Sequence, residues 1–170
     1  MNEESRIEKS ISKLLKKSLI VAKFQIQQFR SLNEFGHVIT KSGFIKEINL
    51  HPYGVKPGAS VIEKISDYND FFESRFLSKR YKGWSITSLI QCEKNTIVYP
   101  GILTQIFYNP DIRHNYISVF KLIEKKWGGF FSLVYRDIKV VDREVFEGKI
   151  EFDIIFEKMK KIGYEFNERN

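Results

Sequence analysis

Apolar residues recur at steps of three, four or seven from about Glu4 to Arg30, and this period places them on one side of a long helix. The apolar side comprises Ile7, Ile11, Leu14, Leu15, Ala22, Ile26 and Phe29. The lysines fall mostly on the other side, at Lys9, Lys13, Lys16, Lys17 and Lys23. The part from Leu19 to Phe29 is rich in β-branched and aromatic residues, so a strand is an alternative there.

A hairpin and a loop are expected next. His37–Thr40 and Phe44–Leu50 flank Lys41-Ser42-Gly43, and Gly43 suits the positive φ that such a turn requires. Residues 51–58 contain two prolines and two glycines, which predicts a loop.

Two further segments have helical character. Ser60 and Glu63 form a capping-box pattern that predicts a central helix. A break between Ser66 and Asn69, where Ser, Asp and Asn can cap a second helix, is an alternative to one continuous helix. Residues 149–162 fit either a strand or a helix by period. The lysines near the end of that segment and the glycine at 163 favour a helix.

Between Trp84 and about Val141, alternating apolar positions separated by short turns predict successive strands. Turns are expected at 93–95 and 127–129, a bend at 100–101 and a loop at 109–115. The expected fold is therefore α+β: an antiparallel sheet of about five to six strands, with the N-terminal, central and C-terminal helices packed on one face.

The length and composition predict one domain spanning residues 1–170. The chain has 42% hydrophobic and 15% aromatic residues, enough to bury a core without disulfide bonds or metal ions. The only cysteine, Cys92, lies in an alternating apolar stretch, which favours a small buried side chain over a reactive thiol.

No secretory signal or membrane-spanning run is visible, and one cysteine requires no oxidising compartment, so a cytoplasmic protein is expected. The 28 Lys/Arg outnumber the 21 Asp/Glu, giving a net charge of +7. A basic balance favours polyanions or acidic partners without choosing between them.

Signatures of cofactor chemistry are absent. The chain has no phosphate-binding glycine motif, no Gly-x-Ser-x-Gly and no Cys-x-x-Cys or His-Glu-x-x-His. We therefore expect no cofactor and no metal site.

Three weaker patterns remain, of which the histidines are the first. His51 and His114 fall in expected loops, and a metal-free ribonuclease could use them as general acid and base, with Arg113 binding the phosphate. The alternative is that they are ordinary surface residues.

The second pattern is a basic and aromatic segment. Its candidate partner- or nucleic-acid-binding residues are Arg75, Lys79, Arg80, Tyr81, Lys82 and Trp84. Cations neutralise phosphates and aromatic faces stack on bases. The alternative is a solvated helix end, with Trp84 starting a strand.

The third pattern is the lysine side of the first helix, which suits nucleic acid, an anionic membrane or an acidic partner. The alternative is a packing helix with a solvated polar side.

Together these features favour a non-catalytic protein that binds another protein, in the style of immunity or inhibitor proteins that occlude a bacterial toxin. A nucleic-acid-binding protein is the first alternative, and a metal-independent ribonuclease the second. The sequence does not indicate the oligomeric state.

Overall fold

The structure is a computed structural model that describes residues 3–29, 34–50, 61–77, 80–108, 112–128, 133–148 and 152–167. Its helices are α1 (Glu3–Phe29), α2 (Val61–Leu77) and α3 (Phe152–Lys161). Its strands are β1 (Phe35–Thr40), β2 (Ile45–Asn49), β3 (Tyr81–Lys94), β4 (Ile97–Tyr108), β5 (Ile112–Trp127), β6 (Leu133–Glu147) and β7 (Glu165–Asn167). The expected α+β class, with its antiparallel sheet and three helices, is confirmed.

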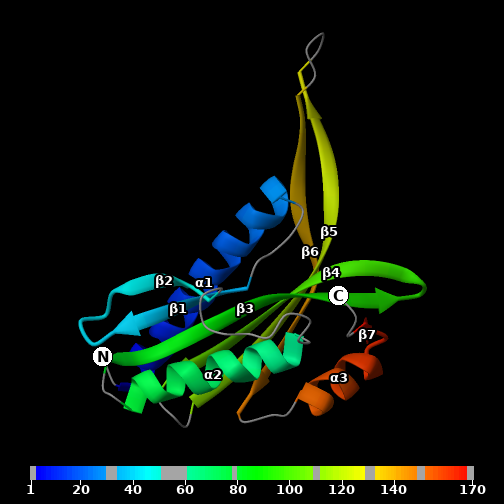
Figure 1. Ribbon diagram of the computed structural model, residues 1–170. Helices are drawn as coiled ribbons and strands as arrows, with labels where there is room; N and C mark the ends of the chain where they lie inside the picture. The colour runs from blue at the N-terminus through cyan, green and yellow to red at the C-terminus, as the bar shows by residue number, and fades with distance from the viewer. Residues whose placement is uncertain are drawn as a thin grey trace.

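The strands pair in the order β2-β1-β3-β4-β5-β6, and every pair is antiparallel. The short strand β7 pairs with residues 91–93 of β3 and extends the edge that β1 begins. Figure 1 shows β5 and β6 rising past the end of α1 as a two-stranded arm. The register shifts between Val119 and Phe120, near the base of this arm. Such irregularities bend and twist a strand pair.

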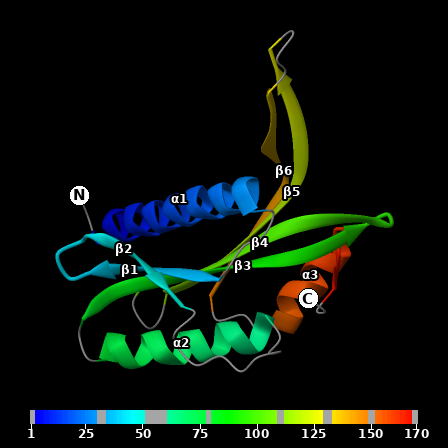
Figure 2. The same ribbon diagram turned by 45° about the horizontal axis from the view of Figure 1, so that its top comes forward.

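The helices cover both faces of the sheet (Figure 2), so the expectation that all three share one face is wrong. Alternate residues of each strand point to opposite faces. Trp84, Ile86 and Phe107 pack with α2 and α3 in one cluster. Ile39, Ile102 and Ile106 face the other way and pack with α1. Each face of the sheet carries apolar residues, and each therefore needs a helical cover.

The helices largely follow their sequence patterns. α1 continues through the segment for which a strand was the alternative, and α2 is continuous through 66–69, where a break was the alternative. Tyr68 and Phe72 are buried one turn apart, so continuing α2 keeps both in the core. The ambiguous C-terminal segment is a helix, α3.

The end of α3 shows why glycine stands at position 163. Gly163 has a φ of 92°. Its amide donates to the Lys160 carbonyl at 2.9 Å, and the Tyr164 amide donates to the Met159 carbonyl at 3.0 Å. This is a Schellman motif, and it turns the chain directly into β7. The hairpin turn at Gly43 has a similar φ of 86°.

Several strand details differ from expectation. β5 begins at Ile112, inside the expected loop 109–115, and β6 continues to Glu147. β7 was not expected, because three residues are too few to show a period. The expected loop at 51–58 lies outside the described residues. Cys92 is buried as expected, and its burial raises the pKa of the thiol to about 12.

Candidate protein-binding surface

The basic and aromatic segment does not form one exposed surface in the described residues. Arg80 and Lys82 are exposed, and Tyr81 is half-buried against the core. Trp84 is only 3% exposed, with its ring stacked on Phe107 at 5.0 Å between centroids. Trp84 therefore agrees with the alternative interpretation, a strand residue, because its position in β3 points into the main core. The side chain of Arg75 and the whole of Lys79 lie outside the described residues.

The structure does not place the Arg113 cation beside His114, as the ribonuclease hypothesis requires. Arg113 is paired with Phe107 across β4 and β5, and its guanidinium lies 5.1 Å from that ring. His114, the next residue, points to the opposite face of the sheet, as alternation requires. Arg113 therefore cannot bind a phosphate beside His114. His51 lies outside the described residues, so its distance from His114 stays open.

The remaining histidine, His37, is buried under α1. Ser18 Oγ lies 3.3 Å from His37 Nδ1 and 3.1 Å from Ser85 Oγ. Burial, aided by the nearby Lys17 charge, lowers the pKa of His37 to about 4. All three residues are at most 2% exposed, so this serine–histidine group packs α1 onto the sheet and offers no nucleophile to a substrate.

The outer side of α1 carries five exposed cations. This surface, the α1 outer face, consists of Arg6, Lys9, Lys13, Lys16, Lys17, Ile20 and Phe24, and all seven are exposed. From Lys9 to Phe29 the helix contains no Asp or Glu. Among the described residues, none of the five cations has an acidic group within 4.0 Å.

The helical period explains this arrangement. Ile11, Leu14 and Ala22 are buried on the sheet side. Lys9, Lys13 and Lys16 continue into Ile20 and Phe24 at steps of three and four, and these five positions fall on the opposite side. The α1 outer face is thus basic along its first part and apolar at its end.

The apolar end distinguishes this surface from a simple charged one. Ile20 is 55% exposed and Phe24, one turn later, is 58% exposed. Nearby, the β5–β6 arm carries Leu122, which is 40% exposed. Leu122 is paired with Ile138, a residue that packs in the cluster under α1, so Leu122 lies on the same side of the sheet as α1.

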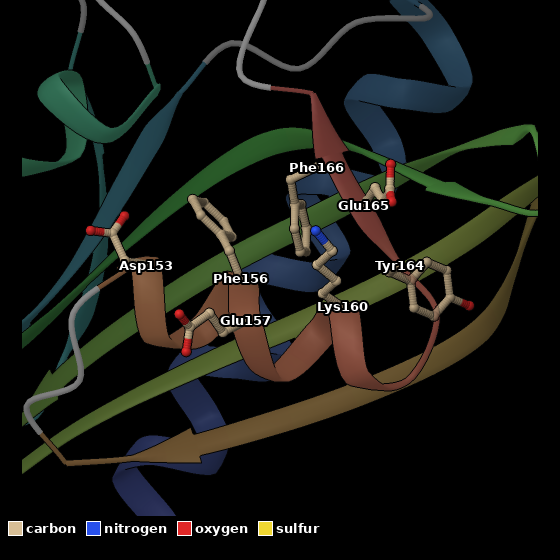
Figure 3. A pocket seen from close by; sticks show the side chains of 7 residues that line it. All are labelled: Asp153, Phe156, Glu157, Lys160, Tyr164, Glu165 and Phe166. Atoms are coloured by element: carbon tan, nitrogen blue, oxygen red, sulfur yellow. The ribbon is translucent and has the colours of Figure 1, made fainter.

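A hollow of about 370 Å³ lies between α3 and β7 (Figure 3). The rings of Phe156 and Phe166 stand 4.6 Å apart, between the carboxylates of Asp153 and Glu157 on one side and Glu165 on the other. Tyr164, also at this hollow, donates its hydroxyl to Asp142 at 2.9 Å. The Tyr164 hydroxyl is thereby held in a hydrogen bond within the fold. Phe156 also contacts the Phe152 ring, and Phe166 also packs against the main core cluster.

Neither a metal centre nor a membrane span is found in the described residues: they contain no group of three His, Cys, Asp or Glu able to hold a metal. No helix in the same ranges is long and apolar enough to cross a membrane. No family model, no curated protein and no solved structure matches this chain. The case for the α1 outer face as a binding surface therefore rests on its geometry.

The sequence pattern alone located the four lysines of this surface, but it did not single out Arg6, Ile20 and Phe24. Ile20 and Phe24 are apolar residues in an apolar-rich segment, and the break in their spacing from the buried row is the signal that could have found them.

Proposed function

We propose that this protein is a non-catalytic binding protein whose α1 outer face docks onto an acidic surface of another protein. The observation that carries the proposal is the pair Ile20 and Phe24, each more than half exposed, at the end of a row of unpaired cations. Exposed apolar side chains are removed from water on docking, and surrounding charges fix the orientation. An immunity or inhibitor role, in which this face occludes a toxin, is the specific form that we propose.

The apolar pair supports a protein partner over a nucleic acid. A nucleic-acid surface uses cations and aromatic rings, which stack on bases. Ile20, beside Phe24, has no aromatic ring with which to stack on a base. Its burial is most favourable in an apolar hollow of a partner protein. The cations then meet acidic side chains at the rim of that hollow, where they speed association.

The test uses four immobilised baits in native cytosol, each with and without nuclease. They are the wild type, Ile20→Ser/Phe24→Ser, Lys13→Glu/Lys16→Glu, and the control Ile97→Ser/Val98→Ser. Ile97 and Val98 are 54% and 56% exposed at the β3–β4 turn, so the control removes similar apolar surface elsewhere.

We expect a nuclease-resistant protein that the wild type and the control retain and that both α1 variants lose. With that partner purified, Ile20→Ser/Phe24→Ser should lower affinity by at least about tenfold, as for a central hot spot. Lys13→Glu/Lys16→Glu should mainly slow association. Captured material that nuclease removes, or a partner that both α1 variants still bind, would overturn the proposal.

A further inference from the structure

A cavity of about 650 Å³ lies between the first half of α1 and the strands β5 and β6. Its α1 wall carries Glu8 and the apolar row Ile7, Ile11 and Leu15. Its sheet wall carries Ile112, His114 and Tyr116, alternate residues of β5, with Glu147 opposite His114 on β6. No Lys or Arg is among the described residues that line it, although the chain as a whole is basic.

The four carboxylates that line this cavity fall into two groups, one that the helix dipole explains and one that it does not. Glu3 and Glu4 stand in the first turn of α1, where acidic groups offset the positive end of the helix dipole. Glu8 lies beyond that turn, and Glu147 belongs to another element. Neither has a described Lys or Arg within 4.0 Å. These two face the cavity from opposite walls without a structural counter-charge.

The remaining walls suit an aliphatic cation. Ile7, Ile11 and Leu15 form a row about 12 Å long on α1, which matches a chain of methylene groups. On the other wall, the rings of His114 and Tyr116 stack at 6.1 Å and 16°. The face of a tyrosine ring attracts ammonium groups. Burial and the Glu147 charge also raise the pKa of Tyr116, as expected in a negative site that is partly shielded from water.

His114 adds an unsatisfied group to the same wall. Among the residues that the structure describes, its buried Nδ1 has no hydrogen-bond partner, and a carboxylate oxygen of Glu147 lies 3.9 Å away. The Glu147 side chain is 77% exposed. Buried ring nitrogens are seldom left without a partner in native proteins. A ligand that draws Glu147 inward would bring its carboxylate toward this nitrogen.

We propose that this cavity binds a linear aliphatic polyamine, with its methylene chain on the α1 apolar row and its ammonium groups at Glu8, Glu147 and the Tyr116 ring. Two opposed carboxylates call for at least two positive charges in the ligand. The apolar walls between them call for hydrocarbon, which a hydrated metal ion lacks. This site is separate from the α1 outer face, so the proposal does not depend on the proposed function.

The test is calorimetric titration of the full chain with spermidine at low ionic strength. We expect one saturable site. Glu8→Gln and Glu147→Gln should each lower the association constant about threefold, and together about tenfold, as for partly exposed charge pairs. Tyr116→Leu should cost about threefold through the lost ring face. Glu157→Gln, which removes an exposed carboxylate from α3, is the matched control and should change nothing.

Two comparison ligands separate the contribution of ligand charge from that of the ligand hydrocarbon chain. Magnesium ion tests charge without hydrocarbon, and 1,6-hexanediol tests hydrocarbon without charge; neither should saturate the site. On spermidine addition, the ring resonances of His114 and Tyr116 should shift in NMR spectra. The proposal is overturned if spermidine does not saturate, if magnesium gives the same isotherm, or if Glu8→Gln/Glu147→Gln binds as well as Glu157→Gln.

Discussion

The two faces of the sheet are packed in different ways. On the α2 and α3 side, one continuous cluster runs from Phe72 through Trp84 and Phe107 to Met159 and Tyr164. On the α1 side, two smaller clusters are separated along the helix. Between them lies the polar group Ser18, His37 and Ser85.

This difference follows from single positions in α1. The buried row of the helix reads Ile11, Leu14, Ser18, Ala22 and Ile26, with small or polar residues in its middle. A serine and an alanine bury little apolar surface, so the middle of α1 gains less from packing than the middle of α2 does. We infer that the helix carrying the proposed docking surface is the more weakly held cover, and the following predictions test this inference.

The largest loss of stability is expected on the α2 and α3 side of the sheet. Trp84→Ala should reduce the free energy of unfolding by about 4 kcal/mol, because it empties a fully packed aromatic site. Urea unfolding followed by circular dichroism measures this loss. A loss below about 1 kcal/mol would show that the aromatic cluster is not the main source of stability.

Leu14→Ala tests the α1 side and should cost less, about 3 kcal/mol. In native-state hydrogen exchange, this variant should lose protection in α1 before α2. Equal loss of protection in both helices would contradict the inference that α1 is held separately.

His37 makes the α1 side sensitive to acid. Its pKa is about 4 in the folded protein and 6.5 in the unfolded chain, so the unfolded state takes up a proton first as pH falls. Its contribution to stability is complete above pH 6.5 and decreases as pH falls toward 4, by about 2 kcal/mol at pH 5. Unfolding at several pH values measures the slope, and an NMR titration of the His37 ring supplies its pKa directly. A His37 pKa near 6.5 in the folded protein would contradict this prediction.

The smallest effects concern two orphan hydroxyls, one on each face. Ser88 on the α2 and α3 side and Ser118 on the α1 side are buried, and neither hydroxyl has a hydrogen-bond partner among the described residues. Replacing either with alanine should leave stability unchanged or raise it by up to about 1 kcal/mol. A clear loss at Ser118 alone would mean that its hydroxyl contributes to the packing of α1.

The sequence predicted the elements better than their placement. The period of α1 and the alternation in β3 are local signals, and both were interpreted correctly. The division of the helices between two faces was missed because it depends on which apolar positions of β3 and β4 receive a cover, and local pattern does not encode that. The unbroken α2 shows the same limit: burial of Tyr68 and Phe72 outweighs the weak helix propensities of 66–69.

For the candidate sites, composition indicated the cations of α1 but not the cavity. Glu8, His114, Tyr116 and Glu147 become neighbours only when β5 and β6 fold against α1. Trp84 was a candidate binding residue because it follows a run of cations, with a strand position as the alternative, and its position in β3 decides its burial.

The double pairing of β3 has a consequence for how the chain folds. One edge of this strand receives β1 along residues 81–87 and β7 along residues 91–93. These partners come from sequence regions far apart, on either side of β3. Bringing such distant strands together loses loop entropy before any stabilising contact forms. Proteins in which long-range pairings dominate therefore fold slowly. During synthesis, β3 can pair with β1 and β4 while the edge reserved for β7 stays open until residue 167 has emerged. β7 is therefore the last strand of the described sheet to become available for pairing during synthesis.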